Sequence, residues 1–183
     1  MKKLIRLFTL ISISLVLTLN LSADQWWFFR ALEQGNIKGV NQALKKGADI
    51  NARNKNNLTG LMIATKANNL GMVKFLISKG ANVNKGNHIN VTPLRWAARF
   101  GRFEILKYLI NKGADINARD EYTGYTPLMA ACGNGHFRIV KYLIIKGAKI
   151  NIKAKRYGTT ALKEAKYKRR HRIVKYLLKH GAK

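Results

Sequence analysis

The sequence contains few acidic residues, one cysteine and two prolines. Each of these shortages excludes or favours particular structural features. Eight Asp and Glu residues stand against 35 Lys and Arg, so the formal net charge is +27 at pH 7. Cys132 is the only cysteine, which excludes an internal disulfide, and its neighbours Ala130 and Ala131 predict a buried packing thiol. The two prolines, Pro93 and Pro127, fit the first turn of a helix, where the missing amide donor costs nothing.

Residues able to carry chemistry are also scarce. There are four histidines, and the chain contains no phosphate-binding loop, nucleophile elbow or dinucleotide fingerprint. Cys132 and His136 could share a helix face, but no further ligand is spaced to complete a metal site. We therefore expect no enzyme, no cofactor and no metal.

What the chain does contain is a repeat. Aligned copies of about 33 residues start at Trp26, Thr59, Thr92, Thr126 and Thr160, and each copy closes on Gly-Ala. A period of this size indicates a solenoid. Within a copy, apolar residues step at helical spacing, as in Ile139, Val140, Leu143 and Ile144, which predicts an amphipathic second helix. The threonine before each first helix is a natural N-cap, and the glycine after each second helix suits a left-handed end.

These motifs resemble the ankyrin repeat family. The fullest match is Thr126-Pro127-Leu128 with Gly135-His136, and Gly113-Ala114-Asp115-Ile116-Asn117 matches the closing signature. The resemblance implies an all-α solenoid of about five helix-turn-helix repeats with β-hairpin-like finger loops. It covers one domain at 24–183, with repeats at about 24–56, 57–89, 90–123, 124–157 and 158–183.

The departures from the family pattern fall mostly at the ends, where a solenoid needs caps. Arg169-Arg170 stands where the last copy would have Gly-His. Trp26, Trp27, Phe28 and Phe29 open the first copy, and we expect them to cover the exposed end of the stack. If they stay exposed, they form an apolar patch able to bind a membrane or a second copy.

Residues 1–23 precede the repeats and have the three parts of a secretory signal. Lys2, Lys3 and Arg6 are followed by an uncharged run from Leu7 to Leu19 and then by Ser22-Ala23. We predict cleavage after Ala23, with an uncleaved membrane anchor as the alternative, and expect no transmembrane segment in the cleaved chain. The expected location is the periplasm of a bacterium, with secretion or N-terminal anchoring as alternatives.

The positive charge has two interpretations. It is densest from 153 to 183, where Glu164 is the only acidic residue. It could attract an acidic partner, an anionic lipid or a surface polysaccharide, or it could reflect lysine-rich composition at solvated positions. No nucleic-acid-binding motif accompanies it, so nucleic acid is not an expected partner.

In the ankyrin family the concave face, made of finger tips and first-helix positions, usually carries the contacts. Mapped onto this chain by register, the expected partner-binding residues are Lys66, Arg99, Phe100, Tyr122, Tyr125, Asn134, Arg156, Tyr157, Tyr167 and Lys168. Aromatic and arginine residues are favoured anchors of protein interfaces.

From the sequence we expect the protein to be a monomeric, non-catalytic adaptor that binds a partner protein. It could protect or inhibit an exported enzyme. The alternative is a basic binder of polyanions or of an anionic envelope surface, driven by net charge.

Overall fold

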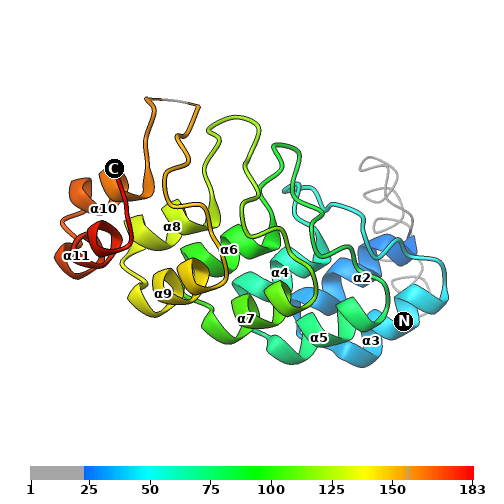
Figure 1. Ribbon diagram of the computed structural model, residues 1–183. Coiled ribbons are helices and arrows are strands. Elements are labelled where there is room, and N and C mark those ends of the chain that lie inside the picture. The colour runs from blue at the N-terminus through cyan, green and yellow to red at the C-terminus, as the bar shows by residue number, and fades with distance from the viewer. Residues whose placement is uncertain (1–22, 156) are drawn as a thin grey trace, which may run out of the picture.

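The computed structural model describes residues 23–155 and 157–183, so the predicted signal segment lies outside the described residues apart from Ala23. The described chain is a row of helix pairs stacked side by side (Figure 1). The first helix of each pair belongs to an inner row and the second to an outer row. The inner helices are α2 (Ala23–Glu33), α4 (Gly60–Lys66), α6 (Pro93–Arg99), α8 (Pro127–Asn134) and α10 (Ala161–Tyr167). The outer helices are α3 (Ile37–Lys45), α5 (Leu70–Ser78), α7 (Phe103–Asn111), α9 (Phe137–Ile145) and α11 (His171–Lys179).

Each helix contacts its partner in the pair, every inner helix contacts the next inner helix, and the outer helices from α5 to α11 contact one another in the same way, as a solenoid requires. The all-α solenoid predicted from the repeat is confirmed. None of the helices in the described part of the chain has the length and apolar character of a membrane span.

Helix ends follow the predicted signals. Thr59, Thr92, Thr126 and Thr160 each accept a hydrogen bond from the amide three residues ahead. Pro93 and Pro127 occupy the first turn of α6 and α8. The glycines that follow the outer helices have positive φ, between 83° at Gly181 and 99° at Gly47.

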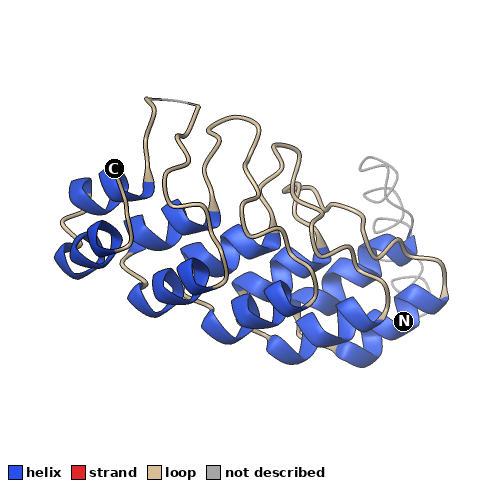
Figure 2. Ribbon diagram, in the orientation of Figure 1, coloured by secondary structure: helices blue, strands red, loops and turns tan. Residues whose placement is uncertain are grey.

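The fingers are the loops 53–58, 86–91, 119–125 and 153–159, which project from one edge of the stack (Figure 2). A backbone hydrogen bond closes the base of each, as between the Asn54 amide and the Leu58 carbonyl at 2.9 Å. Neighbouring fingers are also joined, for example by the Lys155 amide and the Thr123 carbonyl at 2.9 Å. Among the described residues the only strand-like pairing is a single antiparallel bridge between Arg53 and Thr59, so the fingers are hairpin-like without regular strands.

A ladder of amide side chains runs along the stack just after the outer helices. In each step an asparagine accepts a hydrogen bond from a backbone amide one repeat further on, at 2.8 to 2.9 Å. The pairs are Asn51 with Asn82, Asn84 with Asp115, Asn117 with Lys149, and Asn151 with Lys183. At the N-terminal end Gln25 of α2 takes the asparagine's place and exchanges two hydrogen bonds with the backbone of Asp49.

A second set of inter-repeat bonds starts at the residue that precedes each of α7, α9 and α11. The side chain of Arg102 forms a hydrogen bond with the Lys66 carbonyl in the previous repeat. In the same way, His136 bonds to the Arg99 carbonyl and Arg170 to the Gly133 carbonyl. His136 therefore holds the turn, as its register predicts. Arg170 performs the same task in the last repeat, so the missing Gly-His motif does not interrupt the series.

The apolar core is continuous along both rows of helices. Aromatic residues at one equivalent outer-helix position, Phe75, Tyr108, Tyr142 and Tyr176, are half-buried against it. The aromatic run at the N-terminus divides in two. Phe28 and Phe29 are buried in the core, whereas Trp26 and Trp27 remain exposed.

Candidate functional site

The concave face is formed by the inner helices and the fingers, because the fingers project from the inner-row side of the stack (Figure 1). The structure describes nine of the ten residues that register assigns to partner contacts, and Arg156 lies outside the described residues. Seven of these residues are exposed: Lys66, Arg99, Tyr122, Asn134, Tyr157, Tyr167 and Lys168. Phe100 and Tyr125 are half-buried.

Aromatic rings and cations meet where α4 and α6 lie side by side. The Trp96 and Phe100 rings pack edge to face with centroids 5.5 Å apart. Lys66 lies over the Trp96 ring at 6.0 Å, and Arg99 over the Phe100 ring at 5.8 Å. This cluster combines the predicted contact residues Lys66 at the end of α4, Arg99 at the end of α6, and Phe100, which caps α6. Trp96 was not predicted from the sequence, although its spacing of four residues from Phe100 was a usable signal.

Exposed tyrosines mark the C-terminal half of the same face. The Tyr157 side chain, in the fourth finger, is 85% exposed, and that of Tyr167, at the end of α10, is 79% exposed. Tyr122 is the exposed tyrosine of the third finger. The Lys168 ammonium lies 5.0 Å from the Tyr167 ring centroid. These side chains present large aromatic surfaces, with a cation beside the Tyr167 ring.

Tyr125 has a different environment from the other predicted tyrosines. Its hydroxyl group donates a hydrogen bond to Glu164 of α10, and the guanidinium of Arg95 lies over its ring at 5.8 Å. Burial and the bond to Glu164 raise the pKa of Tyr125 well above its usual value. Tyr125 thus links the third finger to the last inner helix, and only part of its ring faces solvent.

A buried ion pair lies beneath this tyrosine. Arg95 of α6 pairs with Asp120, whose side chain is fully buried, while that of Arg95 is 15% exposed. Asp120 also accepts hydrogen bonds from the amides of Thr123 and Tyr125. Burial alone would raise the pKa of Asp120, but the bonds from Thr123, the Arg95 charge and the Tyr125 amide together lower that pKa. The pair lies within the third repeat, the bond from the Tyr125 amide to Asp120 reaches the fourth, and the Tyr125–Glu164 bond joins the fourth to the fifth.

Groups that could act as nucleophile or metal ligand are dispersed. Cys132 is buried, and burial raises the pKa of its thiol to about 12, so it stays protonated at neutral pH. Within the described ranges, no three His, Cys, Asp or Glu side chains come together where they could hold a metal ion. In the described part of the chain, Cys132 is buried away from the exposed aromatic residues and cations that line the predicted contact face.

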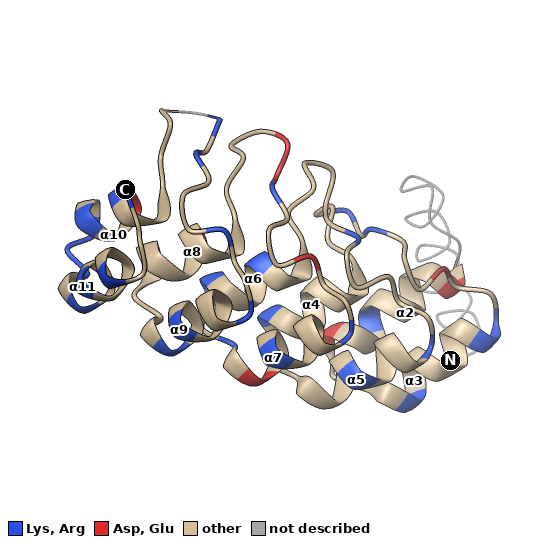
Figure 3. Cartoon of the chain, viewed as in Figure 1, with Lys and Arg blue, Asp and Glu red and all other residues tan. Residues whose placement is uncertain are grey.

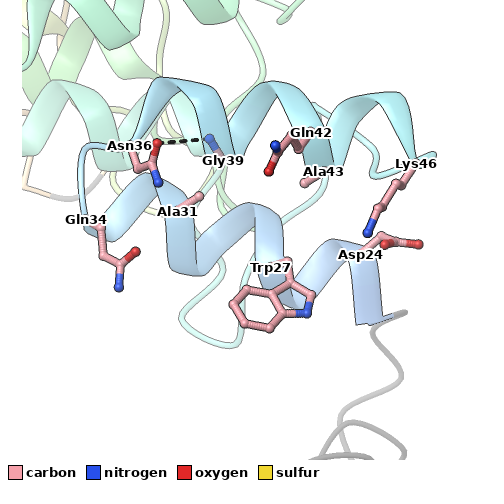
Figure 4. Close-up of a pocket in the computed structure, with 9 residues that line it drawn as sticks. All are labelled: Asp24, Trp27, Ala31, Gln34, Asn36, Gly39, Gln42, Ala43 and Lys46. Atoms are coloured by element: carbon pink, nitrogen blue, oxygen red, sulfur yellow. Dashed lines mark hydrogen bonds between the residues drawn. The ribbon is translucent and has the colours of Figure 1, made fainter.

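A pocket of about 310 Å³ opens at the N-terminal end of the stack, between α2 and α3 (Figure 4). Trp27, Ala31 and Ala43 supply its apolar lining, and Asp24 and Lys46 stand at its rim. Trp27 lies on the outward side of α2, so the end of the stack is only partly covered. Of the aromatic run at the N-terminus, Trp26 and Trp27 are exposed, and their role as a binding patch stays a prediction.

Comparison with protein-family models identifies the family of this chain. The family model described as "Ankyrin repeats (3 copies)" matches residues 28–120 and 119–183, which together span most of the chain. A search of curated proteins found no match.

Proposed function

The chain belongs to the ankyrin repeat family, and from this premise we propose that it is a non-catalytic scaffold that binds a partner protein through its concave face. Ankyrin repeats are generally protein–protein interaction modules. The proposal adds to this the face that is used and the residues that make the contacts.

The observation that carries the proposal is the set of exposed aromatic side chains on the concave face. Tyr157 and Tyr167 are the most exposed large apolar residues of the described chain. Tyrosine fills a pocket on a partner at a small cost in conformational entropy, because it has only two side-chain torsions. Backbone hydrogen bonds between the second, third and fourth fingers restrict the loops that hold these residues, which would lower the cost of binding further.

The role of such a scaffold would be to assemble, protect or inhibit its partner. Residues 1–23 have the sequence of a secretory signal, so we place the partner outside the cytoplasm, in the periplasm. An exported enzyme that the scaffold inhibits or stabilises is the specific form of this proposal.

Affinity capture from the cell envelope with defined variants tests the proposal. The tagged protein should retain one partner through a wash at roughly 0.5 M salt, where screening removes most surface electrostatics. Changing Tyr122 and Tyr167 together to alanine should weaken that complex by about tenfold or more, since buried interface tyrosines are frequent hot spots. The matched control is Ile37→Ala, which removes an exposed apolar side chain from the outer helix α3.

Two results would contradict the proposal. Equal losses in the tyrosine variant and the Ile37 variant would mean that the concave face does not carry the contact. A mixed acidic population that leaves on the high-salt wash would mean that net charge, and not the concave surface, retains the captured proteins.

A second candidate function, binding to polyanions or to an anionic envelope surface, is favoured by one observation. Of the Lys and Arg residues in the described ranges, only Arg95 and Arg138 pair with a carboxylate. The positive charge is therefore largely uncompensated at the protein surface.

A further inference from the structure

The outer helices carry nearly all their charge with one sign. Helices α3, α5, α7, α9 and α11 contain nine Lys and Arg residues and one acidic residue, Glu104. Glu104 itself faces Arg138, with Oε1 and Nη2 3.4 Å apart. The loops that follow add Asp49 and Asp115, whose carboxylates each accept a hydrogen bond from their own turn. The face formed by these helices, which we call the outer face, is strongly cationic (Figure 3).

The repeat turns this composition into an ordered pattern. One position of the outer helix is an exposed lysine in four successive repeats: Lys74, Lys107, Lys141 and Lys175. Packed helices lie about 8 to 10 Å apart, so these ammonium groups form a row with about that spacing. A parallel row stands at the helix ends and consists of Lys46, Lys79, Lys112 and Lys146, all exposed.

The second row is held in place by the aromatic residues beneath it. The ammonium groups of Lys79, Lys112 and Lys146 lie 5.7 to 5.9 Å from the ring centroids of Phe75, Tyr108 and Tyr142. Each pair is four residues apart, on one face of a helix. These contacts order the lysine side chains without neutralising their charge, so part of the entropy cost of binding an anion is already met.

The last two outer helices each carry one exposed aliphatic side chain among their lysines. Ile145, the last residue of α9, is 69% exposed, and Leu178 in α11 is 51% exposed. Lys141 and Lys146 flank the first along the chain, and Lys175 and Lys179 flank the second. Neither α9 nor α11 contains an acidic residue.

Exposed aliphatic residues among lysines distinguish between the possible anionic partners. A soluble polyanion offers charge but nothing to cover Ile145 and Leu178. A bilayer with anionic headgroups offers both, because short apolar side chains can enter the boundary between headgroups and acyl chains while lysines remain at the phosphates. We propose that the outer face of α9 and α11 docks on an anionic membrane surface.

The proposed contact is peripheral and is separate from the concave face. Lipid would lie against the outer helices, and the inner helices and fingers would stay free to hold a protein. The scaffold would then present its partner at a membrane. This inference specifies the second candidate function above and does not require the first.

Vesicle binding of the full chain tests the docking. The probe is phosphatidylcholine vesicles with and without phosphatidylglycerol, and the variant changes Lys141, Lys175 and Lys179 to glutamine. Each basic residue near an anionic surface contributes about a fivefold factor in binding, so the triple variant should bind the anionic vesicles roughly 100-fold less tightly. The matched control changes Lys55, Lys85 and Lys153 to glutamine, which alters net charge equally on the finger side, and should lose far less.

A second variant separates the membrane from other polyanions. Changing Ile145 and Leu178 together to glutamine should weaken vesicle binding by about tenfold, because it removes apolar burial and leaves the charge intact. Its retention on heparin, a soluble polyanion, should be unchanged. Circular dichroism of each variant establishes that the helices are intact before binding is compared.

Three results would overturn the proposal. Equal binding of the full chain to neutral and anionic vesicles would show that anionic headgroups do not drive membrane attachment and that the cationic outer face is not the docking surface. Equal losses in the two lysine variants would show that total charge matters and the outer face does not. Unchanged vesicle binding in the Ile145 and Leu178 variant would identify the ligand as polyanionic in general.

The concave-face proposal is tested separately. Loss of the captured protein in the Tyr122 and Tyr167 variant, with vesicle binding intact, would bear only on that proposal.

Discussion

At the scale of single residues, the buried ion pair of Arg95 and Asp120 is the most consequential interaction. Burying two charges is costly, and the pair persists because Asp120 also accepts hydrogen bonds from two backbone amides. Removing one partner leaves the other charge buried without compensation. Substitution of either residue should therefore destabilise the third repeat, whatever the net contribution of the intact pair to stability.

We predict that Asp120→Asn lowers the free energy of unfolding by about 3 kcal/mol, because Arg95 loses its carboxylate partner. Urea denaturation at about pH 7 measures the change. The control is Glu104→Gln, which breaks the exposed pair with Arg138 and should cost less than about 0.5 kcal/mol. Equal costs for the two variants would contradict the assignment of a buried pair.

The same pair gives a pH dependence with a definite sign. Because the pKa of Asp120 lies below its usual value in the folded chain, its stabilisation is complete above a pH of about 4 and is lost as the pH falls through the folded value. The difference between wild type and Asp120→Asn should therefore shrink as the pH is lowered below about 4. A constant difference over that range would show that the carboxylate charge is not involved.

Tyr125 shows where prediction from sequence ends at this scale. Register places it correctly beside the inner helices, but its partner Glu164 lies 39 residues away, in another repeat. Asp120 and Arg95 are likewise 25 residues apart. Helical periodicity predicts which face of a helix a residue lies on. It does not predict which side chain distant in the sequence that residue contacts.

At the scale of elements, the helix ends were the most predictable part of the molecule. Threonine caps, first-turn prolines and left-handed glycines act within a few residues, so local chemistry determines them. The division of the aromatic run at Trp26–Phe29 could not be predicted in the same way. Its burial depends on how α2 turns against α3 and α4, which no local signal encodes.

Arg169 follows the C-terminus of α10, at a position where glycine is the preferred residue. It has φ of +53°, at a position that is glycine in three other repeats and Asn68 in the second. A left-handed conformation costs a residue with a side chain about 1 kcal/mol relative to glycine. We predict that Arg169→Gly stabilises the protein by about that amount, as measured by the urea midpoint.

The comparison for Arg169→Gly is Lys168→Gly, at the neighbouring residue with negative φ of −86°. There glycine brings only extra freedom to the unfolded chain, so this variant should be destabilised. Stabilisation by both substitutions would mean that removal of positive charge, and not backbone strain, is responsible.

At the scale of the whole molecule, excess positive charge opposes the compact state. The formal net charge is +27, and only Arg95 and Arg138 among the described cations have carboxylate partners. Like charges on successive helices repel one another, and salt screens that repulsion. Few favourable surface pairs exist in the described chain for salt to weaken.

We predict that raising sodium chloride from about 0.02 M to about 0.5 M stabilises the protein by about 1 kcal/mol, or about 2 to 4 °C in Tm. Thermal unfolding followed by circular dichroism measures the shift. The variant with glutamine at Lys141, Lys175 and Lys179 should show a smaller salt response, because it has less repulsion to screen. A Tm that falls with added salt would show that attractive ion pairs dominate.

The repeat made the architecture predictable at this scale, since five registers in one chain have few alternative interpretations. The charge was visible in the composition, but its ordering into two rows on one face required the stacking of the outer helices. The composition gives the number of charged residues, whereas the repeat period of the solenoid determines their positions on the surface.

The asparagine ladder gives the stack a polarity. Each repeat offers an acceptor to the one that follows and a donor to the one before, and Gln25 closes the series at α2. An additional repeat inserted between the first and second would find both partners already in place. One added before α2 would compete with Gln25 for the Asp49 amide, so the chain can be lengthened from within more readily than from its N-terminal end.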